Sequence, residues 1–114
     1  MSDCLFCKII TGEIPSKKIY EDEDVFAFYD IAPQAPVHFL VVPKTHIAHV
    51  MDLKEEHVEL MGKMLFCAQN IAKDLGLENN GARFVFYCKE SAGQTVWHIH
   101  LHVLGGRDFE WPPG

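Results

Sequence analysis

The chain has 114 residues, of which 48% are hydrophobic and 11% aromatic, so it can fill one core but hardly two. Its net charge of -6 and its 10 scattered Lys and Arg residues exclude the clustered basic surface that a nucleic acid polymer requires. No apolar stretch approaches the roughly 18 residues of a membrane span and no signal peptide is recognisable, so we expect one cytoplasmic domain, residues 1–114, without a membrane partner.

The first half of the chain predicts a short helix followed by three strands. Gly12 ends the helix, because glycine readily adopts the left-handed conformation that follows a last helical turn. Pro43 stops the third strand, because proline cannot donate a hydrogen bond to a sheet. The predicted ranges are 4–11 for the helix and 18–20, 25–29 and 38–42 for the strands.

The second half predicts one long helix followed by two strands. Asp52 and Glu55 have the spacing of a capping box, apolar residues then recur three and four positions apart, and Gly76 follows the last of them. The predicted ranges are 53–75 for the helix and 83–87 and 97–104 for the strands. Because the chain lacks βαβ alternation, we expect an α+β fold with a five-stranded antiparallel sheet, one long helix and one short helix.

Histidine occupies every second position in one segment near the C-terminus, Trp97-His98-Ile99-His100-Leu101-His102-Val103-Leu104. Successive side chains of a strand point to opposite faces, so this pattern predicts a presented face of three imidazoles and a buried apolar face. At a rise of about 3.3 Å per residue, the outer two histidines lie roughly 13 Å apart. A zinc ion needs its ligands at about 2.0–2.1 Å, so it could bind two of the three histidines but hardly all of them.

A phosphate over the middle histidine would bring the flanking imidazoles close to its oxygens and to the leaving atom. A neutral imidazole attacks phosphorus readily near pH 7 when its other nitrogen is held by an acceptor. We therefore predict that His100 is a nucleophile and that a protonated neighbour is the general acid. This chemistry needs no redox or organic cofactor, whereas metal binding by two of the histidines remains the alternative.

Several motifs together resemble the histidine triad (HIT) superfamily, and in particular its Hint branch. The matching segments are 28–39, 43–47, 92–95, 98–107 and 111–114. The resemblance implies a homodimer whose two sheets join into ten antiparallel strands. It also implies a purine nucleotide-binding hydrolase that cleaves the P–N bond of nucleoside 5′-phosphoramidates, through a covalent nucleotidyl-histidine, to give AMP or GMP.

The resemblance assigns a separate role to each histidine of the motif. His100 would carry the nucleotidyl group, the backbone carbonyl of His98 would orient it, and His102 would bind the phosphate oxygens. His38 would support the nucleophile from the neighbouring strand, although without the resemblance it is only a histidine that opens an apolar strand.

The resemblance also implies a nucleotide pocket. Asp30 and Ile31 would hold the ribose hydroxyls and the sugar–base junction, and a carboxylate can accept hydrogen bonds from both hydroxyls. Trp111 would reach toward the site of the other subunit. The base pocket would consist of Phe6, Ile9 and Phe28, and the phosphate loop of Gly93, Gln94 and Thr95. Taken singly, Asp30 would be interpreted as a turn residue and the apolar residues as plain core.

Two positions depart from the family pattern. If the turn at residues 79–81 carries a one-residue insertion, Tyr87 stands where the family usually has Asn before the phosphate loop, so a polar contact to the substrate is either lost or replaced by a phenol. Thr95 stands where the family usually has Ser, which keeps the hydroxyl but adds a methyl group near the leaving group. Both departures bear on substrate specificity.

Cys4 and Cys7 have the spacing of half a zinc site. Some HIT proteins resemble this chain in carrying such a pair, which implies a structural zinc bound by Cys4, Cys7, His46 and His98. The alternative is a pair of reduced thiols without metal. A redox motif is disfavoured because no strand or βαβ unit precedes the pair.

Three other functions remain open. A dinucleoside polyphosphate hydrolase of the Fhit type is disfavoured by the run Gly105-Gly106-Arg107 and by the Trp-Pro-Pro-Gly tail. A nucleotide-binding adaptor with little turnover is disfavoured by the three intact histidines. A metal-dependent hydrolase would lose its activity on chelation.

Overall fold

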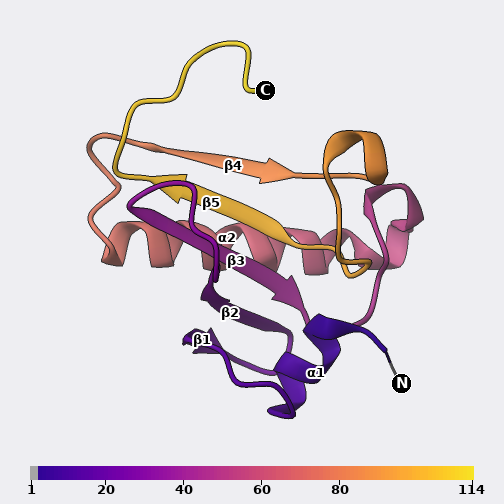
Figure 1. The fold of residues 1–114 in the computed structure, drawn as a ribbon. Coiled ribbons are helices and arrows are strands. Elements are labelled where there is room, and N and C mark those ends of the chain that lie inside the picture. The colour runs from indigo at the N-terminus through magenta and orange to yellow at the C-terminus, as the bar shows by residue number, and fades with distance from the viewer. Residues whose placement is uncertain (1–2) are drawn as a thin grey trace.

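The computed structural model describes residues 3–114. Its elements are α1 (Leu5–Thr11), β1 (Lys18–Glu21), β2 (Val25–Tyr29), β3 (Val37–Pro43), α2 (Val58–Asp74), β4 (Ala82–Phe86) and β5 (Leu101–Gly105). The strands form one antiparallel sheet in the order β1-β2-β3-β5-β4 (Figure 1). The predicted α+β fold with five antiparallel strands, one long helix and one short helix is therefore confirmed. No helix within the described range is long and apolar enough to cross a bilayer.

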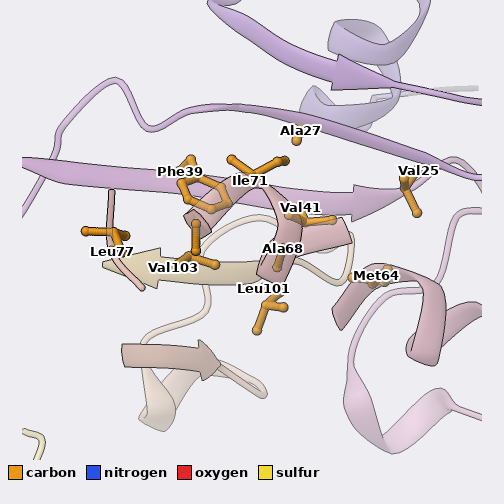
Figure 2. Close-up of a cluster of buried hydrophobic side chains, with 11 residues drawn as sticks. Val25, Ala27, Phe39, Val41, Met64, Ala68, Ile71, Leu77, Leu101 and Val103 are labelled. Carbon is orange, nitrogen blue, oxygen red and sulfur yellow. The ribbon is translucent and has the colours of Figure 1, made fainter. Parts of the chain in front are cut away.

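Helix α2 lies along one face of the sheet and forms the larger core with it (Figure 1). The side chains of β3 and β5 that point to this face are almost completely buried, as strand alternation requires. The cluster combines Val25, Ala27, Phe39, Val41, Leu101 and Val103 of the strands with Met64, Ala68, Ile71, Ala72 and Leu77 (Figure 2). Because burying one large apolar side chain is worth about 1.5–3 kcal/mol, this cluster is the main stabilising contact of the fold.

The opposite face of the sheet carries the short helix and the histidines. Phe6 and Ile9 of α1 pack on Phe28 and Leu40 in a second, smaller apolar cluster. In the register of β3 and β5, His38 lies opposite Leu104, and Leu40 lies opposite His102. Two histidines from different strands are thus diagonal neighbours on the face that α2 leaves open.

Helix α2 begins at Val58, later than the predicted residue 53. Asp52 does not cap it, because residues 50–52 and 55–57 form two 3-10 turns separated by extended backbone at Leu53 and Lys54. The Lys54 N–H donates to His57 Nδ1 at 3.0 Å, which stabilises the second turn locally. The end of α2 is as predicted, since Gly76 follows it with a φ of 83°.

The histidine segment is a strand only from Leu101 onward, so the prediction of a strand over 97–104 was wrong for its first half. The ladder between β3 and β5 ends where Val41 pairs with Leu101, close to Pro43, which has no N–H to donate. Before that point single hydrogen bonds hold the segment, such as Ile99 N–H to the Ile47 carbonyl at 2.6 Å. Trp97 consequently lies half exposed, whereas the three histidines are buried rather than presented on a surface.

Candidate active site and metal cluster

A cavity of about 280 Å³ lies on the face of the sheet opposite α2. It is lined by residues predicted for catalysis or nucleotide binding, namely Phe6, Ile9, Phe28, Asp30, Ile31, Tyr87, Gly93, Thr95, His100 and His102. Leu40 and Val96 complete the lining and were not predicted. Strand alternation could have indicated Leu40, because it lies two residues after His38 and shares its face.

The part of the cavity that α1 and β2 line is apolar, and we call it the slot. The rings of Phe6 and Phe28 meet edge to face with centroids 5.4 Å apart, and Ile9 is buried beside them. Phe6 also meets the His100 ring at 4.9 Å with the two planes at 90°. Such a slot suits a flat aromatic group placed next to the imidazole of His100.

Asp30 and Ile31 form the rim of the cavity next to the slot. Asp30 Oδ1 accepts the Ala32 N–H at 2.8 Å, and its Oδ2 lies 3.4 Å from His38 Nε2. The carboxylate therefore keeps lone pairs for a ligand, because two oxygens offer about four acceptor positions. Ile31 is almost fully exposed, so it can cover a bound ligand from outside.

The hydrogen bonds of His38 determine its tautomer. The Gln34 N–H donates to His38 Nδ1 at 3.0 Å, so neutral His38 carries its proton on Nε2. Burial lowers the pKa of His38, although the Asp30 carboxylate opposes this shift. Of the two acceptors near Nε2, His102 Nδ1 at 3.0 Å is closer than Asp30 Oδ2 at 3.4 Å, so His38 donates mainly to His102.

This donation determines the tautomer of His102 in turn. With Nδ1 used as an acceptor, neutral His102 carries its proton on Nε2. That nitrogen is buried and has no hydrogen-bond partner among residues 3–114. Burial lowers the pKa of His102 to about 4, and the neighbouring His100 and His38 add to the shift. The side chain is thus a neutral donor without a partner in the wall of the cavity, which suits an anionic ligand.

His100 has the opposite arrangement of donor and acceptor. Its Nδ1–H donates to the backbone carbonyl of His98 at 2.7 Å, so its Nε2 carries the lone pair. Burial lowers the pKa of His100, so the ring is neutral at pH 7. A neutral imidazole whose second nitrogen is held by a carbonyl is the arrangement that nucleophilic attack requires.

The loop before the histidine segment offers fewer free donors than predicted. The N–H groups of Gly93 and Gln94 bond to the carbonyls of Glu90 and Lys89, at 3.0 and 3.1 Å. The Gln94 side chain is also used inside the structure, since it accepts the Lys89 N–H and donates to the Ala48 carbonyl. Gln94 therefore holds the loop in place. Within residues 3–114, only Thr95 of the three keeps its N–H and hydroxyl free of internal hydrogen bonds.

Tyr87, which precedes the predicted phosphate loop, and Trp111, which was predicted to reach toward the other subunit, lie in different environments. The Tyr87 ring stacks obliquely on His102 at 4.6 Å and forms a wall of the cavity. Trp111 does not line the cavity of its own chain and is 86% exposed.

Four potential metal ligands converge on one point beside the cavity, namely Cys4, Cys7, His46 and His98. His98 Nδ1 lies 3.3 Å from Cys4 Sγ and 3.2 Å from His46 Nδ1, and Cys7 Sγ lies 3.4 Å from His46 Nδ1. Tetrahedral zinc, with Zn–N of about 2.0–2.1 Å and Zn–S of about 2.3 Å, separates its ligands by roughly 3.3–3.8 Å. The donor set and the spacing therefore fit zinc.

The outer surroundings of this cluster distinguish ligation from redox chemistry. His98 Nε2–H donates to the Pro43 carbonyl at 2.8 Å, which leaves Nδ1 unprotonated for a metal. Burial and the adjacent Cys4 raise the pKa of the Cys7 thiol to about 11. A reactive redox thiol needs a lowered pKa, so without a cation the Cys7 thiol is not activated for redox chemistry.

Comparison with known proteins places this arrangement in a family. A family model for the HIT domain matches residues 11–109. A HIT family hydrolase from Legionella pneumophila is 49% identical, with a TM-score of 0.97 over 98% of this chain and 100% of its own. The 14 kDa zinc-binding protein of Zea mays is 48% identical over 99% of this chain and 89% of its own. A histidine triad nucleotide-binding protein from Candida albicans is 34% identical, with a TM-score of 0.83 over 96% of this chain and 83% of its own. The chain therefore belongs to the histidine triad (HIT) family, as its sequence predicted.

Proposed function

We propose that this chain, as one catalytic domain, hydrolyses the P–N bond of purine nucleoside 5′-phosphoramidates to AMP or GMP. The observation that carries the proposal is the complementary pair of histidines that line the cavity: His100 keeps a lone pair on Nε2, and the buried Nε2–H of His102 has no hydrogen-bond partner among residues 3–114. An apolar slot and a carboxylate lie next to them, which suits a base and a ribose. The hydrolase and nucleotide-binding names of two relatives agree with this reaction.

The reaction would proceed in two displacements at the α-phosphorus. His100 Nε2 attacks, the P–N bond breaks, and the amine leaves after taking up one proton. The His98 carbonyl stabilises the positive charge of the phosphorylated imidazole through Nδ1–H. Water then attacks the phosphorus, releases the mononucleotide and a proton, and restores neutral His100.

His102 would act mainly as a hydrogen-bond donor to the phosphate oxygens. A pKa of about 4 makes it neutral at pH 7, so it is a poor source of the proton that the amine needs. This differs from the expectation of a protonated neighbour as general acid. The Thr95 hydroxyl, which borders the same cavity, is better placed to pass a proton from solvent to the leaving nitrogen.

A structural zinc on Cys4, Cys7, His46 and His98 belongs to the proposal. The fit of the four donors and the zinc-binding name of a relative support it. When bound, zinc would supply cross-linking and no catalytic step. It would join the start of α1, which carries Phe6, to the segment that carries His100.

A homodimer through β4 completes the proposal. This edge strand has one unpaired side, and its residues Phe84 and Phe86 are about 40% exposed. A second copy pairing there would extend the sheet to ten strands and cover both rings. Such a dimer would also give the exposed Trp111 a site to reach. Sedimentation of the protein should then give twice the chain mass, and a monomer would exclude this arrangement.

The test of the function compares an adenosine 5′-phosphoramidate with a diadenosine polyphosphate, with zinc content measured on the same sample. We expect the phosphoramidate to be turned over faster and one zinc ion per chain. Faster cleavage of the dinucleotide would favour the Fhit-type reaction instead. Nucleotide binding without turnover of either compound would favour an adaptor.

A further inference from the structure

A second hollow, of about 640 Å³, adjoins the candidate active site. Thr95 and Val96 line both the hollow and the smaller cavity that contains His100, so the two spaces meet at these residues. The outer walls of the hollow are Leu5 and Trp97, whose exposed fractions are 41% and 40%. Nothing in the proposed binding of the nucleotide uses these two side chains.

The first cavity leaves no room for the rest of a substrate. Its volume of about 280 Å³ lies just below the roughly 300–1,000 Å³ that ligand pockets usually have, so we expect a mononucleotide to fill it. Another hollow borders Asp30, Ile31 and His38, which is the ribose end of the site. The hollow beyond Thr95 is therefore the one that borders the phosphate end, where the amine departs.

We propose that this hollow binds the apolar or aromatic side chain of the leaving amine. This inference rests on the proposed function, and it narrows the substrates to phosphoramidates of primary amines that carry such a side chain. Leu5, Val96 and Trp97 supply the apolar surface. The Trp97 ring is held edge-on by His49, with centroids 5.8 Å apart, so this wall is formed before a ligand binds.

Charge narrows the class further. The Asp3 carboxylate borders the hollow, so an acidic side chain on the amine would be repelled. The polar floor consists of Cys4, Cys7 and His46, whose ligand atoms face one another in the metal cluster. The apolar walls are thus the part of the hollow left for recognition.

The experiment compares two adenosine 5′-phosphoramidates, the N-ethyl and the N-(2-phenylethyl) compounds. Both release a primary alkylamine, so the departing nitrogens are alike and only the side chain differs. We expect kcat/KM to favour the phenylethyl compound by about tenfold or more. Trp97→Ala should remove most of this preference and Leu5→Ala part of it, while turnover of the ethyl compound is unchanged. Leu65→Ala, at an exposed apolar residue of α2 outside the hollow, is the control and should keep the preference.

Equal turnover of both compounds by the natural chain would overturn the inference and leave the proposed function intact. A preference that survives in both Trp97→Ala and Leu5→Ala would also overturn it. Turnover of neither compound would contradict the proposed function. Calorimetry on His100→Ala would then test binding in the hollow separately from turnover. Tighter binding of the phenylethyl compound than of the ethyl compound, lost when Trp97→Ala is added, would support the subsite. Equal affinities for the two compounds would exclude it.

Discussion

His98 and His102 stand four residues apart in one motif, yet their surroundings give them different uses. Both are buried, at 0% and 8% exposed, and burial lowers the pKa of each to about 4. His98 donates a hydrogen bond from Nε2–H to the Pro43 carbonyl, and its Nδ1 lies 3.3 Å from Cys4 Sγ. His102 uses Nδ1 to accept a hydrogen bond from His38, so its buried Nε2–H is left without a partner among residues 3–114. Hydrogen-bond partners, rather than burial, thus distinguish a structural histidine from one available for chemistry.

The largest effect is expected at His100, which lies between these two histidines. His100→Ala should lower kcat by about a thousandfold or more, because no other group in the cavity presents an unprotonated imidazole nitrogen at this position. Calorimetric binding of AMP should survive, since the base slot and Asp30 remain. Substantial residual turnover would show that another group is the nucleophile.

Substitution of His102, at the phosphate end of the site, should lower catalysis and leave stability almost unchanged. His102→Ala removes the Nε2–H donor that has no partner among residues 3–114, so kcat should fall by about a hundredfold to a thousandfold, as for other lost oxyanion donors. The zinc content and the melting temperature should change little. A loss of zinc in this variant would mean that His102 and the metal cluster at His98 do not act independently.

Substitution in the cluster of Cys4, Cys7, His46 and His98 should have the reverse effect and lower stability more than catalysis. Cys7→Ser removes one ligand of the cluster, so the protein should lose zinc, and the melting temperature should fall by about 10 °C. Chelation of the natural chain should lower it similarly. Cys67→Ser, at a half-buried cysteine outside the cluster, is the control and should retain zinc. If the folded fraction of Cys7→Ser has lost kcat as severely as His102→Ala, the cluster takes part in catalysis.

A smaller effect is expected from pH. Folding lowers the pKa of His102 from 6.5 to about 4 because of burial, with His100 and His38 adding to the shift and Asp30 opposing it. At pH 5 the unfolded chain binds this proton and the folded chain does not, so stability is lost as the pH falls from about 6.5 toward 4. Between pH 7 and pH 5, the free energy of unfolding should fall by about 1–2 kcal/mol more in the natural chain than in His102→Ala, measured by urea titration. Equal losses in both proteins would assign the pH dependence to other groups.

Most helices and strands were predicted from local sequence signals, and the wrong predictions have identifiable causes in the structure. Gly12 and Gly76 mark the ends of both helices with positive φ, as their positions predicted. The start of α2 was misplaced because the hydrogen bond from Lys54 to His57 replaces the cap predicted at Asp52. Local sequence signals also could not predict the role of Gln94 in the loop before the histidine segment, because its side chain donates to the carbonyl of the distant residue Ala48.

Periodicity and breakers in the sequence were enough to predict the fold class, and the resemblance of its motifs to a family predicted the family and most residues that line the cavity, although not Leu40 and Val96. Only the tertiary structure decided what each gathered residue can do. The proton positions on His100 and His102 depend on the His98 carbonyl and on His38, and the cluster at Cys4 depends on a fourth segment that carries His46. Such assignments require hydrogen-bond distances between segments far apart in sequence, which no local pattern encodes.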